Sequence, residues 1–81
     1  MPYRLRYDPA ADAVHDAMPA PASEQLTLAL ADVCHDPIGH SIPYGEDDHV
    51  VRMVITDTAF AVILIGDATK TVTVLQINYL D

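Results

Sequence analysis

Residues 59–65 form a run of seven side chains with no polar member. Turn-forming residues bound this run at 56–58 and again at 66–69. An apolar run of this length between two turns is typical of a strand that is covered on both faces. We therefore expect residues 59–65 to be the middle strand of an antiparallel meander, with strands at 49–55 and 71–79 on either side.

The N-terminal part of the sequence predicts a strand followed by a helix. Residues 3–7 alternate aromatic or aliphatic side chains with arginines, which is the period of a half-buried strand. Asp8 and Pro9 then indicate a helix start, with Asp8 as the N-cap and Pro9 at the first helical position. The apolar stripe of this helix is expected on Ala10, Val14, Ala17 and Met18.

A second helix is predicted after a proline break. Pro19 and Pro21 are expected to end the first helix, and the second begins near Ser23. Asp36-Pro37 ends it, and residues 36–48 are expected to form a loop. Its core face is expected on Leu26, Leu30, Val33 and Cys34.

These elements predict one α+β domain over residues 1–81, in the order β-α-α-β-β-β: an N-terminal strand, a helical hairpin and a three-strand antiparallel meander. The hydrophobic fraction of 51% favours a packed core over disorder. Residues 1–6 lack the apolar core of a signal peptide, and the longest apolar run falls far short of the roughly 20 residues that span a bilayer. We expect a cytoplasmic domain that does not enter the membrane.

The charge balance is strongly acidic, with 12 Asp and Glu against four Lys and Arg and a formal net charge of −8. Proteins that hold RNA or DNA neutralise phosphates with clustered Lys and Arg, and that clustering is missing here. Binding to free nucleic acid is therefore disfavoured. The acidity has two open explanations, which are solubility in general and a basic partner surface.

Two segments of the sequence share the pattern D-x-x-H-D, around His15 and His35. In an antiparallel hairpin these histidines are separated along the helix axis by about ten helical residues, or about 15 Å, which is too far for them to share an ion. We expect local Asp–His pairs instead. Residues 46–49 lack the oxygen spacing and glycine of a calcium loop, and are expected to be a charged guard before an edge strand. No metal or cofactor site is predicted.

A family resemblance covers nearly the whole chain. It rests on the opening YRLRYDPAAD, the proline-broken hairpin MPAPASEQLTLALADVCHDPIG, and the closing strands HVVRMVI, AFAVILI and TVTVLQINYL. In these segments and their order the sequence resembles the RelE/ParE toxin superfamily of bacterial toxin–antitoxin modules. Members that cut messenger RNA on the ribosome carry several basic residues on the closing strands and a Tyr or His near the C-terminus. Such groups position the scissile phosphate and stabilise its charge.

The resemblance implies two candidate catalytic residues. Arg52 falls where a Lys or Arg of the first closing strand is expected, and Tyr79 falls at the terminal His or Tyr position. Other cations of the pattern are missing, because the middle strand reads Phe60-Ala61 in place of an aromatic-Arg pair and the last strand has Gln76 where Arg is common. Phosphate chemistry depends on several placed positive charges, so an efficient nuclease is disfavoured.

Both candidates also have a structural explanation. Arg52 is equally accounted for as a solvated strand residue paired with Glu46 or Asp47, and Tyr79 as an amphipathic aromatic residue closing the sheet edge.

Three further residues are candidates for contacting a substrate or partner. Arg4 and Arg6 share one face of the first strand, and Gln76 lies on the last. An exposed face with no binding role is the alternative for the two arginines.

Three functions remain open at this stage. The first is a toxin-fold protein of a toxin–antitoxin module that acts mainly through protein binding and has weak or no mRNA cleavage. The second is an active ribosome-dependent endoribonuclease with a reduced site, and the third is a gyrase-directed toxin of the ParE type. An antitoxin-like protein is the expected partner, with the ribosome or gyrase as targets and a homodimer left open.

Overall fold

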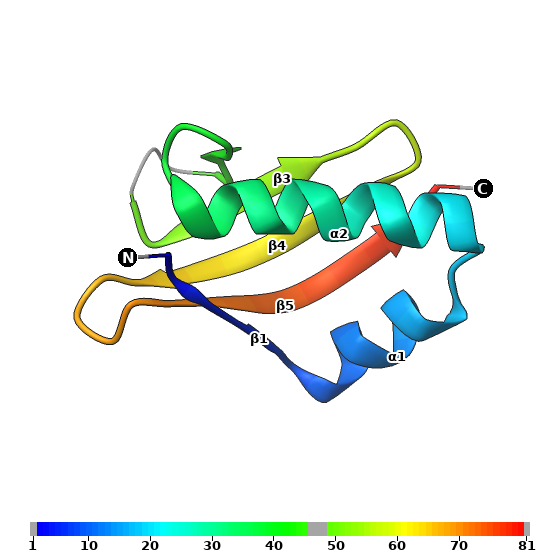
Figure 1. Cartoon of the computed structure of the whole chain (residues 1–81), viewed down its shortest axis with the longest axis horizontal. Helices are drawn as coiled ribbons and strands as arrows, with labels where there is room; N and C mark the ends of the chain where they lie inside the picture. Colours follow the sequence, from blue (N-terminus) through cyan, green and yellow to red (C-terminus); the bar gives the residue numbers. More distant parts are fainter. Residues whose placement is uncertain (1, 46–48, 81) are drawn as a thin grey trace.

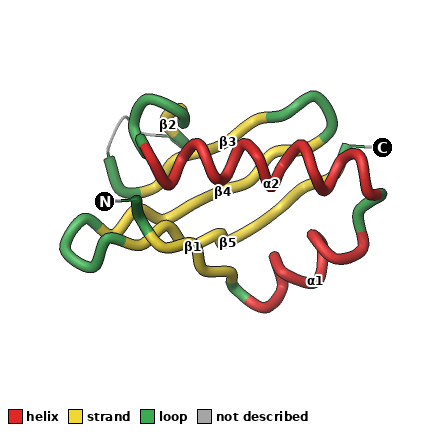
Figure 2. The backbone as a smooth tube through the Cα atoms, in the orientation of Figure 1, coloured by secondary structure: helices red, strands yellow, loops and turns green. Residues whose placement is uncertain are grey.

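The computed structural model describes residues 2–45 and 49–80. Its elements are β1 (Arg4–Tyr7), α1 (Pro9–Ala17), α2 (Ala20–His35), β2 (Ile42–Pro43), β3 (Val51–Ile55), β4 (Ala59–Gly66) and β5 (Thr71–Tyr79). The strands form one sheet in the order β1-β5-β4-β3-β2, and both helices lie on the same side of it (Figures 1 and 2). β1 runs parallel to β5, and the other neighbours are antiparallel. The predicted α+β fold is confirmed.

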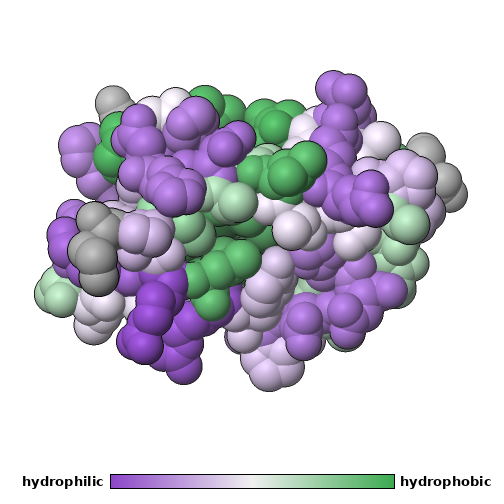
Figure 3. Space-filling view, viewed as in Figure 1, coloured by the Kyte–Doolittle hydropathy of each residue, from purple (hydrophilic) through white to green (hydrophobic). Residues whose placement is uncertain are grey.

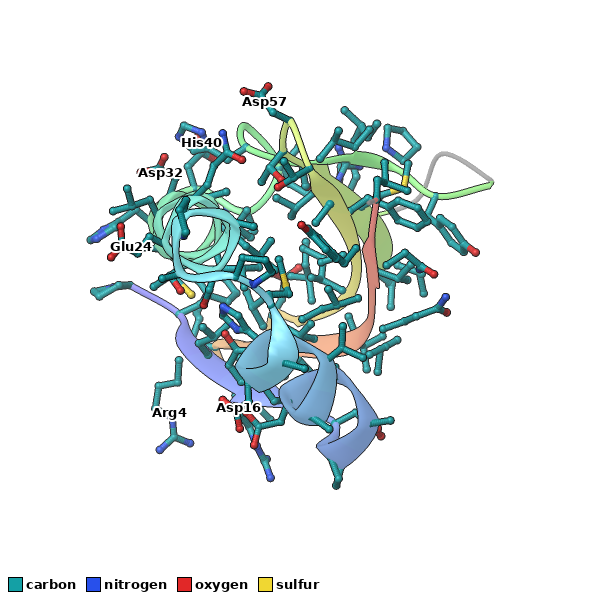
Figure 4. The ribbon with its side chains drawn as sticks, turned by 90° about the vertical axis from the view of Figure 1, so that its right-hand side faces the viewer. Arg4, Asp16, Glu24, Asp32, His40 and Asp57 are labelled. Atoms are coloured by element: carbon teal, nitrogen blue, oxygen red, sulfur yellow. The ribbon has the colours of Figure 1, made fainter. Side chains whose placement is uncertain are left out.

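β4 is the middle strand of the meander, as predicted, but the helices cover only one of its faces. Ala61, Ile63 and Ile65 are buried on the side of the helices. On the other side, none of the described helices lies over the sheet. There Leu64 keeps 37% of its surface exposed, whereas Val62 is 5% exposed, so the expectation of a strand covered on both faces holds at Val62 and fails at Leu64. The sheet curves around the helices (Figure 4).

A β-bulge keeps the apolar side chains of β5 in the core. Val62 lies opposite Gln76, whereas the next residue of β4 lies opposite Val74, so Leu75 is the extra residue. Strict alternation after Val74 would turn Gln76 toward the helices. The bulge instead turns Ile77 inward, where it is buried, and leaves Gln76 on the outer face.

α1 begins where the sequence predicts, and its predicted apolar stripe is partly confirmed. Asp8 is the N-cap and its carboxylate accepts a hydrogen bond from the backbone N–H two residues on, at 3.0 Å. Of the predicted stripe, Met18 is buried and Val14 packs against the core, whereas Ala10 and Ala17 are exposed and Ala11 is buried instead. Alanines bury little area, so they do not decide which row faces the core.

α2 begins at Ala20, earlier than predicted. Pro19 is its N-cap and the carbonyl of Pro19 accepts the N–H of Ser23 at 2.9 Å, which is the first helical hydrogen bond. Pro21 lies in the first turn, where N–H groups have no intrahelical acceptor, so proline does not disrupt the helix there. The predicted core face is confirmed, with four residues buried: Leu26, Leu30, Val33 and Cys34.

The predicted loop at 36–48 contains a short edge strand. β2 pairs antiparallel with β3, placing Ile42 opposite Met53 and Pro43 opposite Arg52. Proline lacks an N–H and is tolerated at a sheet edge, which explains why this segment does not read as a strand in sequence. β3 begins two residues later than predicted. Of the proposed charged guard at 46–49, residues 46–48 lie outside the described residues.

Candidate functional site

Arg52 points to the side of the sheet that the helices cover. Register places it opposite Ile63, a core residue, and its exposed fraction is 5%. Its Nε donates to the hydroxyl of Ser41 at 2.6 Å and a terminal nitrogen donates to the Ser41 carbonyl at 2.9 Å. Arg52 therefore ties β3 to the segment before β2. The expectation of a solvated residue is wrong, because these contacts hold the guanidinium inside the fold; Glu46 and Asp47, its predicted partners, lie outside the described residues.

Tyr79 lies at the end of β5, beside α1. Its side chain is 36% exposed and lines an apolar hollow of about 290 Å³ with Ala13, Val14, Ala17 and Met18. The predicted role of an aromatic residue closing the end of the sheet agrees with this position.

The two candidate catalytic residues are far apart. Arg52 pairs with Ile63 and Tyr79 pairs with Ala59, four residues away along β4. At a rise of about 3.3 Å per residue this is a separation of about 13 Å along the strand, and the two residues also lie on opposite sides of β4. One phosphate cannot contact both side chains. The structure does not assemble the predicted pair into a catalytic site.

The remaining three candidates lie on the opposite side of the sheet, which we call the open sheet face. Arg4 and Arg6 pair with Thr71 and Thr73 on β5, and Gln76 lies on the same side beyond the bulge. Figure 4 shows the guanidinium of Arg4 pointing away from the helices. Toward β3 this face becomes apolar through six residues: Val51, Met53, Ile55, Phe60, Val62 and Leu64.

His15 joins three elements, a role that its sequence context does not reveal. Its Nδ1 lies 2.9 Å from the hydroxyl of Tyr7 on β1, and its Nε2 lies 3.2 Å from both the Ser23 carbonyl and the Thr27 hydroxyl on α2. The Thr27 hydroxyl itself donates to the Ser23 carbonyl at 2.8 Å. The hydrogen bonds are satisfied when Nε2 carries the proton and Nδ1 accepts from Tyr7.

This arrangement is structural rather than catalytic. Thr27 donates to a carbonyl, so its proton is not directed at the imidazole, and it is not activated as a nucleophile. The expected Asp–His pair is wrong for His15, because its ring reaches Tyr7 and the start of α2 instead of Asp12 or Asp16. Burial, followed by the nearby carboxylate of Asp12, raises the pKa of Tyr7 above its ordinary value.

A second polar cluster fastens the N-terminus to the turn between β4 and β5. The hydroxyl of Tyr3 donates to a carboxylate oxygen of Asp67 at 2.7 Å, and the ammonium of Lys70 lies 5.2 Å from the centre of the Tyr3 ring. The hydrogen bond to Asp67 raises the pKa of Tyr3. Lys70 is thus engaged with a neighbouring ring at the end of the sheet.

Within residues 2–45 and 49–80, no group of three or more His, Cys, Asp or Glu side chains could hold a metal ion. In the same part of the chain, no helix is long and apolar enough to cross a membrane. Burial raises the pKa of the Cys34 thiol above its ordinary value, which disfavours the reactive thiolate.

Comparison with known proteins places the fold. No protein-family model matches the sequence, and no curated protein matches it. The isolated Escherichia coli RelE toxin is similar in structure, with a TM-score of 0.82 and 21% identity over 98% of this chain and 85% of that one. The toxin–antitoxin complex RelBE2 from Mycobacterium tuberculosis contains a chain with a TM-score of 0.81 and 18% identity, over 98% of this chain and 99% of that one.

A third match is a chain of the intact E. coli RelBE toxin–antitoxin complex, with a TM-score of 0.81 and 21% identity over 98% of each chain. The class that these observations define is an α+β domain with the fold of RelE toxins. The resemblance to the RelE/ParE superfamily that the sequence suggests is confirmed at the level of the fold.

Proposed function

We propose that this chain is the toxin-fold partner of a toxin–antitoxin pair and that it acts through protein binding, with weak or no cleavage of messenger RNA. The observation that carries the proposal is the position of Arg52. It is the one basic residue on the three closing strands, and it is buried on the helix side in contact with Ser41. A phosphate on the open sheet face would not meet it.

The charges on the sheet also support weak or no cleavage of messenger RNA. Cleavage of RNA needs cations that hold the phosphate and stabilise the charge that develops on it. Gln76 and the aliphatic residues of β4 supply none, and Arg4 and Arg6 lie at the far edge of the sheet on β1. The formal net charge of −8 repels RNA at long range.

The solved structures make an antitoxin-like partner the natural candidate. Two of the chains similar to this one belong to toxin–antitoxin complexes, RelBE2 of M. tuberculosis and RelBE of E. coli. Another is an E. coli RelE mutant in complex with a peptide of the antitoxin RelB. We propose that this chain also binds an antitoxin-like protein and that it acts in the cytoplasm.

The test is a binding measurement with the protein encoded beside this one. The chain and the product of the neighbouring reading frame are co-expressed with a tag on one of them, purified together and titrated calorimetrically. We expect a stable complex of defined stoichiometry. A neighbouring product that shows no heat of binding and does not co-purify would contradict the proposal of a toxin–antitoxin pair.

A further inference from the structure

The open sheet face is a surface over which the described part of the chain places no helix. Both helices pack on the other side (Figures 1 and 4), and apolar side chains occupy the part of this face formed by β3 and β4. Ile55 is 59% exposed and Leu64 is 37% exposed, whereas Val62, which lies between them on this face, is 5% exposed. Apolar side chains exposed on a sheet face that no helix covers make that face a candidate contact surface.

Charge is distributed very unevenly between the two sides of the molecule. The described acidic residues lie in α1, in α2, at helix caps and in turns, and none lies in a strand. Figure 4 shows Asp16, Glu24 and Asp32 on the helices, and Figure 3 shows hydrophilic residues over much of the helix side. The charged side chains of the described strands on the open sheet face are Arg4 and Arg6, at the β1 edge.

This distribution decides how two copies of the chain can approach one another. Each copy carries a formal net charge of −8, so contact through the helix side would bring carboxylates together. Contact through the open sheet face does not, because the described strands carry no acidic side chain. It removes apolar area from water and keeps both acidic sides in solvent.

We propose that the open sheet face is the contact surface of a homodimer, in which β3 and β4 of two copies pack face to face. Two sheets packed in this way lie about 10 Å apart and bury the side chains between them. Because the sheet is curved, its β1 edge bends away from the partner copy. Arg4 and Arg6 therefore lie at the rim of the contact. This inference does not rest on the proposed function.

The size of the face limits how much surface a dimer can bury. The molecule measures 33 × 24 Å across its two longer axes, so a flat contact fits within a rectangle of about 790 Å². A stable interface buries about 800 Å² on each partner. Because a curved sheet makes contact over only part of its footprint, we expect a weak dimer that dissociates on dilution through the micromolar range.

Sedimentation velocity across a range of about 1 µM to 1 mM, bracketing the expected Kd, tests the proposal. The variants Ile55→Glu and Leu64→Glu place a carboxylate on the apolar part of the face and are expected to raise the dimer Kd at least about tenfold. Leu28→Glu is the matched control, because Leu28 is 68% exposed on α2 on the opposite side. The Leu28→Glu variant should have the same dimer Kd as the wild type. Circular dichroism verifies that each variant is folded.

Two measurements on the unmodified protein complete the test. Added salt screens the repulsion between acidic copies, with the Debye length falling from about 30 Å at 0.01 M to about 10 Å at 0.1 M, so salt should strengthen the dimer. Amide shifts that change on dilution should map to β3 and β4. A chain that stays monomeric over the whole range, a dimer weakened by salt, or one lost equally in Leu28→Glu would overturn the proposal. Failure of the toxin–antitoxin proposal would leave all of these results unchanged.

Discussion

At the scale of single residues, the most informative position is Arg52. A basic residue on a strand is usually a solvated residue, but here the carbonyl and hydroxyl of Ser41 bind a guanidinium that is 95% removed from solvent. The alternation of β3 puts Arg52 on the same side as Val54, which is in the core. Arg52 is therefore a structural residue that links β3 to the segment before β2.

Replacing Arg52 should measurably destabilise the fold. In Arg52→Gln the hydrogen bonds to Ser41 are lost and the partly buried acceptors of Ser41 lose their partner, which should lower the free energy of unfolding by about 1–3 kcal/mol. Arg4→Gln is the control, since Arg4 is exposed and its loss should cost no more than about 0.5 kcal/mol. Urea unfolding of both variants measures the difference. Equal stability of the two would show that the Ser41 contacts contribute nothing.

The buried thiol of Cys34 should make stability fall at alkaline pH. Burial raises its folded pKa above the ordinary value of a thiol, so the unfolded chain releases this proton first. This contribution to stability is fully present below the unfolded pKa of about 8.5 and is lost as pH rises toward the folded pKa, with Tyr7 adding a similar loss above about pH 10. Cys34→Ala should show a shallower loss between about pH 9 and 10 in urea unfolding. An identical slope in the wild type and the variant would refute this linkage.

At the scale of elements, the stability of the domain depends on the contact between α2 and the sheet. Leu30 is completely buried, whereas Leu28, two residues earlier, is 68% exposed. Leu30→Ala should lower the free energy of unfolding by about 2–4 kcal/mol because it leaves a cavity, and Leu28→Ala should change it by less than about 0.5 kcal/mol. Thermal or urea unfolding compares the pair directly. Similar stability of both variants would mean that α2 packs through another face.

Most of the element order is predictable from the sequence, and the errors have physical causes. Periodicity locates α2 and the central strand, because Leu26, Leu30 and the run at 59–65 carry large apolar side chains. β2 is not predictable from the sequence because two residues that include a proline have no strand pattern. The bulge at Leu75 is not predictable either, because a local signal cannot show which of two neighbouring residues will be unpaired.

The site is harder to predict than the fold because its partners are distant in sequence. Arg52 contacts Ser41 across 11 residues, and Tyr3 contacts Asp67 across 64 residues. Nothing in the local sequence around Arg52 shows that the alternation of β3 directs it toward the helices. The scarcity of cations on the closing strands, where Arg52 is the one basic residue, is in contrast visible in the sequence itself.

At the scale of the whole molecule, the fold separates an acidic helix side from a sheet face with apolar residues and two arginines at its edge. The fold is that of RelE toxins, with a TM-score of 0.82 to the isolated E. coli toxin. Arg52 and Tyr79, however, lie on the helix side and about 13 Å apart along the sheet. The toxin fold is therefore present without a cluster of cations on the open sheet face of its described strands.

The most direct test of this account is the cleavage of messenger RNA in a translation reaction with purified components. The purified chain is added to translating ribosomes and cuts are mapped by primer extension. An active ribosome-dependent ribonuclease is the positive control and Tyr79→Phe is the variant, since Tyr79 is 36% exposed and removal of its hydroxyl should leave the fold intact. We predict few or no cuts above background for the wild type and no change for the variant. Efficient cleavage by the wild type that Tyr79→Phe abolishes would contradict the account.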